Sequence, residues 1–220
     1  PFIVLKDANL DLACRGAITA RFVNAGQSCI AAKKFIIHKD KYTEFSEEII
    51  DLVKELKMGD PLEKDTKIGP LVRKEQLIKL EKQVHNAIKQ ARLLVGGYRL
   101  ERKGYFYVPT VLANVDRNNP IFREEVFGPV LPIIKVMSDN EAIDLANDSE
   151  YGLGASLWTK DLKKSQEYAK KIEAGFVSVN QIVKSDPRLP FGGIKNSGIG
   201  HELSRYGLLE FCNIKSVVIK

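Results

Sequence analysis

The sequence predicts an α/β protein, a mostly parallel, twisted β-sheet with helices on both of its faces. Two observations lead to this fold class. Of the 220 residues, 44% are hydrophobic and 28% are charged, a balance typical of a folded chain with a sizeable core. Between residues 130 and 180, segments alternate in the order strand, helix, strand, helix, strand. Such alternation implies right-handed crossovers between parallel strands.

The first half of the chain supplies one short strand and three helices. Apolar residues recur at helical spacing up to a terminator near Gly26, and the stretch KFIIH, residues 34–38, then predicts a strand. Two further apolar stripes, followed by MGDP and by LLVGG, predict core-facing helices. The apolar positions of the three helices are Leu10, Cys14, Ala17 and Ala20; Tyr42, Phe45, Ile49, Leu52 and Leu56; and Leu77, Leu80, Val84, Ile88 and Ala91.

The alternating region begins with the strand-like VLPIIKV, residues 130–136. Ser138 and Glu141 follow at the spacing of a capping box, so a helix is expected to start there. The strand-like GASLWT comes next, then a helix with Leu162, Ala169 and Ile172 on its inner face, and then the strand-like FVSVN. We expect functional loops at the carboxyl ends of such strands. The candidates are residues 180–198 and the turn around Cys29.

Composition narrows the choice of partners and compartment. The net charge of +6 comes from interleaved signs, 34 Lys and Arg against 28 Asp and Glu, with no basic stripe that would predict a nucleic-acid partner. No 18-residue apolar run or leader predicts a membrane span or secretion, so a cytoplasmic location is expected. Three cysteines without a C-x-x-C pair argue against a metal site and against disulfides. The chain starts with Pro1, and we expect it to be a piece of a longer protein.

Cys29 could be a nucleophile or a small core residue. Free cysteines are more often buried, but a position just past a helix end, among small residues, favours the thiolate and supplies backbone N–H donors. A cysteine–histidine dyad also stays possible, although the histidines at 38, 85 and 201 lie in no context that supports one. Spacing alone does not decide between these interpretations.

Four ordered motifs give the chain a resemblance to the aldehyde dehydrogenase superfamily. They are FVNAGQSC at 22–29, REEVFGPVLPI at 123–133, NDSEYGLGASLWTKD at 147–161 and LPFGGIKNSGIGHELSRYGLLEF at 189–211. The resemblance implies that residues 1–213 form the C-terminal catalytic domain and that residues 214–220 form a strand for assembly into a homo-oligomer, a dimer or a tetramer. It also implies that an upstream cofactor-binding domain lies outside this chain.

The resemblance assigns roles to individual residues. Cys29 is expected to attack an aldehyde and to form a thiohemiacetal that becomes a thioester. Glu125 and Phe127 are expected to contact the nicotinamide end of NAD or NADP. For the substrate, the resemblance implies Phe191 and Ser28, while Ser185 and Arg188 stand in the loop expected at the tunnel mouth. Arg188 could grip a carboxylate in a bidentate way, or it could be a solvated loop charge.

Three stretches of the sequence are most similar to the succinate-semialdehyde dehydrogenase branch of the family. They are NAGQSCIAAKKFIIH, MGDP and SGIGHELSRYGLLEFCNIKSV. Some members of that branch carry an arginine where this chain has Val23. The glutamate base and the asparagine of the oxyanion hole are expected upstream, so residues 1–220 alone are predicted to be inactive. Two alternatives stay open, an acylating enzyme that passes the acyl group to coenzyme A and a non-catalytic assembly or binding module.

Overall fold

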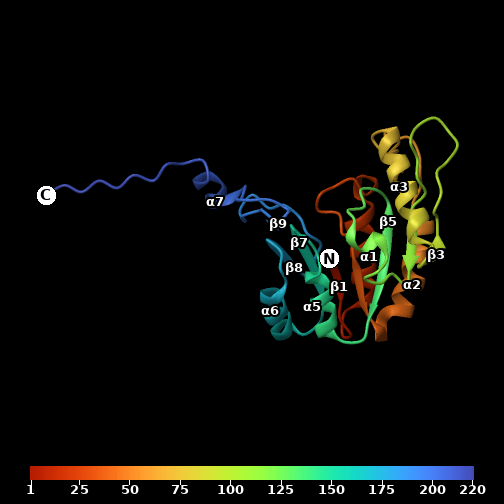
Figure 1. Ribbon diagram of the computed structural model, residues 1–220, viewed down its shortest axis with the longest axis horizontal. Helices are drawn as coiled ribbons and strands as arrows, with labels where there is room; N and C mark the ends of the chain where they lie inside the picture. The colour runs from red at the N-terminus through yellow and green to blue at the C-terminus, as the bar shows by residue number, and fades with distance from the viewer.

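A seven-stranded sheet organises the computed structural model, which describes residues 1–220 (Figure 1). Its strands lie in the order β3-β4-β5-β2-β1-β7-β8, and every neighbouring pair is parallel except β3 with β4. The bounds are β1 Phe2–Val4, β2 Phe35–His38, β3 Arg92–Val95, β4 Thr110–Ala113, β5 Val130–Val136, β7 Gly154–Trp158 and β8 Phe176–Val179. The predicted mostly parallel sheet is confirmed.

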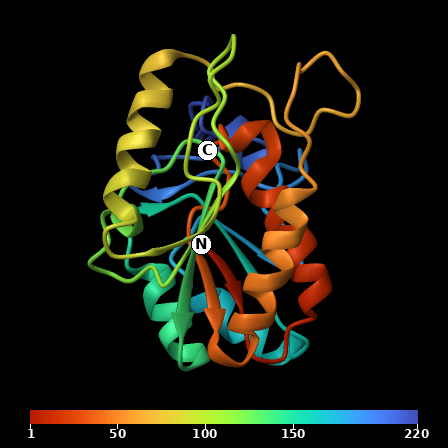
Figure 2. The same ribbon diagram turned by 90° about the vertical axis from the view of Figure 1, so that its right-hand side faces the viewer.

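Helices pack on both faces of this sheet, as Figure 2 shows for α3 on one side and α2 on the other. The helices are α1 Leu10–Phe22, α2 Lys39–Lys54, α3 Lys74–Ala87, α4 Pro120–Arg123, α5 Asp139–Asn147, α6 Leu162–Lys171 and α7 Ser204–Leu209. Successive strand residues point to opposite faces, so Phe2 and Val4 join one core with α1 and α2, while Ile3 joins the other with α3 and α5. Both faces are therefore buried.

The alternating region forms as predicted, with one difference in the helix cap. Ser138 Oγ accepts the backbone N–H of Glu141 at 3.2 Å, and the Glu141 carboxylate accepts the N–H of Met137 at 2.6 Å. The reciprocal bond therefore reaches one residue further back than a standard capping box. The crossovers are also longer than simple alternation implies, since β2 and β1 lie between β5 and β7.

Asp7 joins the carboxyl ends of two central strands. Its carboxylate accepts the hydroxyl of Thr159, at 2.7 and 2.9 Å, and the backbone N–H groups of Lys160 and Asp161 at 3.0 Å each. Burial opposes its ionisation, but these donors outweigh that effect and hold the Asp7 pKa below its usual range. The junction between β1 and β7 thus depends on an ionised carboxylate.

Beyond α7 the chain leaves the body of the protein (Figure 1). Residues 212–220 form no helix or strand, and Ile214, Val218 and Ile219 are each about nine-tenths exposed. The strand expected at 214–220 pairs with nothing inside this chain, and its pairing with a second copy stays a prediction. No helix of the fold combines the length and the apolar character that a membrane crossing requires.

Candidate active site

A tight reversal of the chain carries Cys29. Helix α1 ends at Phe22 and continues as the 3-10 turn η1, Val23–Gly26, before the chain bends back toward β2. Asn24, Ala25 and Gly26 have φ angles of 51°, 53° and 74°, three successive residues in the left-handed region. The Asn24 side chain closes the turn by donating to the carbonyl of Gln27 at 2.9 Å. Asparagine and glycine suit this conformation, whereas alanine adopts it at a cost in free energy.

The thiol lies at the tip of this reversal, beside an unused donor. The N–H of Ala31 donates to the Ser28 carbonyl at 3.0 Å, which bends the chain around Cys29. Cys29 is exposed, and its own backbone N–H donates to no group of the chain. A thiol next to a free N–H can attack an electrophile and stabilise the oxyanion that forms. Cys14, by contrast, is fully buried in the α1 packing, as predicted.

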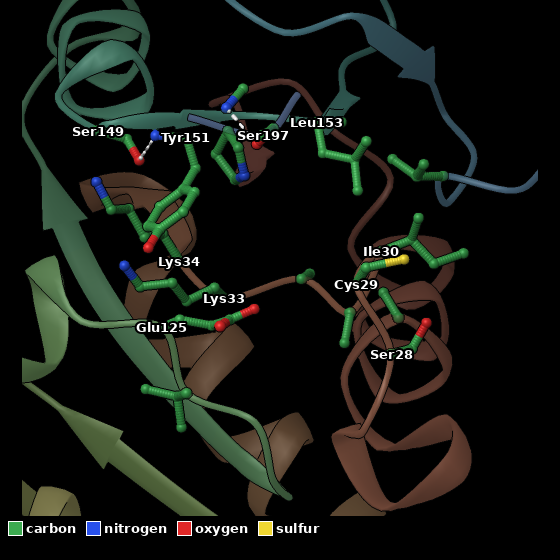
Figure 3. Close-up of a pocket in the computed structure, with 18 of the residues that line it drawn as sticks. Ser28, Cys29, Ile30, Lys33, Lys34, Glu125, Ser149, Tyr151, Leu153 and Ser197 are labelled. Atoms are coloured by element: carbon green, nitrogen blue, oxygen red, sulfur yellow. Dashed lines mark hydrogen bonds between the residues drawn. The ribbon is translucent and has the colours of Figure 1, made fainter. Parts of the chain in front are cut away.

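Figure 3 shows the cavity into which these groups face. Its volume is about 260 Å³, and Ser28, Cys29, Glu125 and Phe127 all line it. Four residues predicted from motifs about 100 positions apart are thereby brought together. None of the three histidines lines the cavity, so the structure offers no partner for a cysteine–histidine dyad. No cluster of three or more potential metal ligands is present anywhere in the chain.

The cavity lies at the opposite edge of the sheet from the one predicted. Most of its lining comes from residues 28–34, 125–127 and 149–154. These segments directly precede β2, β5 and β7 and so mark the amino ends of these strands. The expectation that the turn around Cys29 lies at carboxyl ends was wrong. A crossover helix runs antiparallel to its strands, so the loop that follows α1 is delivered to the amino edge. The loop after β8 returns to that edge, since the backbone of Gly192 packs against Gly175.

Helix α3 holds the segment that carries Glu125. The Gln83 amide donates to the Glu125 carbonyl at 3.0 Å, and the Gln76 amide donates to the carbonyl of Phe127. The Glu125 carboxylate itself is exposed and accepts no hydrogen bond from the chain. The backbone is therefore fixed while the carboxylate stays free for a ligand.

Two lysines of the cavity were missed by the sequence analysis. Lys33 Nζ donates to the carbonyls of Phe122 and Arg123 at 3.0 Å each, and Lys34 Nζ donates to the carbonyl of Asp148 at 2.5 Å. Burial lowers the pKa of Lys33 to about 8 and that of Lys34 to about 7. Both follow Cys29 within five residues, so a search for basic residues near the nucleophile would have found them.

Three predicted substrate residues lie outside this cavity. The Phe191 side chain is 7% exposed and packs 6.2 Å from the ring of Phe176. Ser185 is exposed and does not line this cavity. Arg188 is 85% exposed and binds Asp186, with Nε and Nη2 at 2.9 and 2.6 Å from the two carboxylate oxygens. From the same loop the cavity takes Val183, a residue that no motif singled out.

Comparison with known proteins identifies the group to which this arrangement belongs. The sequence model of the aldehyde dehydrogenase family matches residues 1–217 of this chain. The chain belongs to the aldehyde dehydrogenase family. The expected resemblance is thereby confirmed, and the cavity that contains Cys29 is the part of this aldehyde dehydrogenase chain where its four motifs converge.

The curated relatives that this chain matches are about twice as long as the chain itself. A Mycobacterium bovis (strain BCG / Pasteur 1173P2) succinate-semialdehyde dehydrogenase whose name specifies NADP(+) is 43% identical over all of this chain and 48% of its own length. An Escherichia coli (strain K12) succinate semialdehyde dehydrogenase whose name specifies NAD(P)+ is 45% identical over 99% of this chain and 47% of itself. The chain thus spans about half the length of these curated relatives.

Solved structures agree with the fold at the level of the whole chain. The crystal structure of succinate-semialdehyde dehydrogenase from Burkholderia pseudomallei is 37% identical, with a TM-score of 0.93, over 96% of this chain and 44% of its own. A structure concerned with cofactor and substrate selection by Gox0499 is 44% identical with a TM-score of 0.97, over 100% and 48%. The predicted fold class is confirmed by these neighbours.

Proposed function

We propose that the protein containing this chain oxidises an aldehyde with NAD or NADP, and that Cys29 is the nucleophile. One observation carries the proposal: an exposed thiol with a free backbone N–H shares a cavity with the unpaired carboxylate of Glu125. The names of the relatives, which specify NADP(+) or NAD(P)+, support the cofactor class.

The residues that line the cavity fit the nicotinamide end of such a cofactor. The Glu125 carboxylate, with no partner in the chain, is a suitable acceptor for the paired hydroxyls of a ribose. Phe127, half-buried beside it, offers a flat apolar surface to an aromatic ring. When bound, the nicotinamide supplies a hydride acceptor. Glu125 and Phe127 would hold it, and Ser28 would contact the aldehyde beside Cys29.

The chemistry of this chain centres on the sulfur atom. The Cys29 thiolate forms a bond to the aldehyde carbon, the carbonyl electron pair moves to oxygen, and the Cys29 N–H donates to that oxygen. The product is a thiohemiacetal in its oxyanion form. Because the proton of the thiol has already left, oxidation removes only one hydride from the carbon, and a thioester remains on Cys29. Water then releases a carboxylic acid, whereas a coenzyme A thiol would release an acyl-CoA instead.

Succinate semialdehyde is the substrate that the relatives support. Arg188 was singled out for the substrate carboxylate, but its guanidinium already binds Asp186. A carboxylate would have to displace Asp186 from Arg188, or be bound by residues outside this chain. We therefore propose the semialdehyde as the substrate. The roles expected for Arg188, Phe191 and Ser185 in binding it stay predictions, since all three residues lie outside the cavity of Cys29.

The test uses the full-length protein from its source cells. We expect it to reduce NAD(P)+ when succinate semialdehyde is added, and we expect C29S to abolish this reaction. C212S is the matched control. Cys212 is also an exposed thiol, but it lies in the C-terminal arm, residues 212–220, away from the cavity. Mass spectrometry of the product distinguishes succinate from succinyl-CoA. Full activity in C29S would refute the proposal.

We propose that residues 1–220 alone do not turn over, since the relatives use a chain about twice as long, and that the protein works as a homo-oligomer in the cytoplasm. The exposed apolar arm supports assembly, and the free cysteines fit a reducing compartment. Light scattering of the protein with and without residues 212–220 tests the assembly. An unchanged mass would contradict it.

A further inference from the structure

A single buried guanidinium links the two loops that form the cavity. Arg21, in the last turn of α1, is 1% exposed, which makes it the largest side chain buried to this degree in the chain. Its Nη1 donates to the carbonyl of Ala32 at 2.8 Å, and its Nη2 lies 2.9 Å from the carbonyl of Gly26. These two carbonyls belong to the loop of the nucleophile, one on each side of Cys29.

The same guanidinium also holds the loop of Glu125. Nη2 lies 2.9 Å from the carbonyl of Val126 and 2.7 Å from that of Gly128, residues that enclose Phe127. The separation in sequence is more than 100 residues. The planar fork of an arginine can place donors on both loops at once, which the single ammonium of a lysine does less well.

No carboxylate neutralises this buried charge at contact distance. Burial lowers the Arg21 pKa to about 10, opposed by the more distant Glu125. Its hydrogen-bond partners are all backbone carbonyls. One of them, the carbonyl of Gly26, lies at the end of the turn η1 that continues α1, where carbonyl dipoles favour a cation. Apolar residues usually serve stability at least as well as a buried ion. The arrangement of Arg21 therefore points to a role in fixing geometry.

We propose that Arg21 is the positioning residue that sets the separation between the Cys29 thiol and the nicotinamide held by Glu125 and Phe127. This inference rests on the proposed function, because hydride transfer is the step that needs the two loops in register. Misplacement of reacting groups by about 1 Å can slow a reaction on the order of a hundredfold. Arg21 does not line the cavity, so it acts through the two loops.

The test compares R21M and R21K with R15M in the full-length protein. Arg15 lies on the same helix, 66% exposed and paired with Asp11 at 2.9 Å, so its loss controls for removing an arginine from α1. We expect R21M to lower kcat at least about tenfold, while the KM for aldehyde and the rate of Cys29 alkylation by iodoacetamide change less than about threefold. R21K should fall between R21M and the wild type, and R15M should match the wild type.

A second readout does not depend on turnover. By hydrogen–deuterium exchange, R21M should raise deuterium uptake in residues 26–32 and 126–128 together, and R15M should not. If the wild type oxidises no aldehyde, the proposed function fails, and the exchange data still decide whether Arg21 couples the loops. An unchanged kcat in R21M, or faster exchange confined to α1, would overturn the inference. Should R21M not fold, R21K carries both measurements.

Discussion

Replacing Gly26 by alanine should destabilise the junction between the loop of Cys29 and the loop of Glu125. A Cβ at this position would lie 2.2 Å from the Gly128 carbonyl oxygen and 2.7 Å from Arg21 Nη2. Both distances are shorter than real Cβ contacts allow, and the nearer neighbour is backbone. In addition, φ is +74°, a conformation that disfavours any side chain. The loops can relieve the overlap only by moving apart.

The expected loss follows from two contributions. A left-handed alanine costs about 1–2 kcal/mol. Displacing one carbonyl from a charged donor costs roughly 1.5–3 kcal/mol. The sum, about 2.5–5 kcal/mol, is a large part of the roughly 5–15 kcal/mol that typically stabilises a domain. Urea denaturation followed by circular dichroism measures it. The matched control is G69A, whose Cβ would meet Pro61 at an ordinary 3.6 Å, and we expect a change within about 1 kcal/mol. A loss below about 1 kcal/mol in G26A would refute the proposed contact.

Three further predictions concern titration and accessibility. In the native protein a thiol reagent should modify Cys29 and Cys212 but not the fully buried Cys14, whose pKa burial raises; mass mapping of labelled peptides checks this. Because the folded pKa of Asp7 lies below its unfolded value, its stabilisation is full above about pH 4 and is lost as the pH falls through the folded pKa. D7N should therefore flatten the acid limb of the melting-temperature profile, and an unchanged limb would contradict this. Since the Lys34 pKa is lowered to about 7, the folded state binds fewer protons between pH 7 and 10, so stability should rise with pH there. K34M should reduce that rise to the part that Lys33 contributes, because burial lowers the Lys33 pKa to about 8, and urea midpoints measure the difference.

Hydrophobic periodicity predicted most of the fold because it reports directly on the buried faces. The helices at α1, α2, α3, α5 and α6 and the strands at β2, β5, β7 and β8 all follow patterns of period 3.6 or short apolar runs. The antiparallel pairing of β3 with β4 could not be predicted, because it is set by the partner strand and by a register shift between Leu93 and Val95. The two-stranded pairing of β6, Tyr151–Gly152, with β9, Ile194–Lys195, is equally non-local.

Site residues could be predicted from the sequence where a single motif contains the reactive side chain. Cys29 and Glu125 were identified in this way, and both line the cavity. Arg188 was expected either to grip a carboxylate or to be a solvated loop charge. Its local partner Asp186 stands two residues away in the sequence, so the pairing could have been predicted from that spacing. A sequence pattern does not state which of two partners a guanidinium chooses, since that depends on how the loop folds.

Arg21 shows why the rest of the site needed the structure. In the sequence it is one of 34 basic residues, at the end of a helix where a basic side chain is ordinary. Its acceptors are backbone carbonyls, which every residue has, so the residue types at 32, 126 and 128 do not indicate the contact. Gly26 gives the one visible trace, because a larger residue would occupy the space between Arg21 and Gly128. Hence the glycine three residues before the nucleophile indicates that another loop, about 100 residues away in the sequence, packs closely against it. If that reasoning holds, G26A and R21M should produce the same paired increase in exchange at 26–32 and 126–128, although one adds atoms to the junction and the other removes its donors.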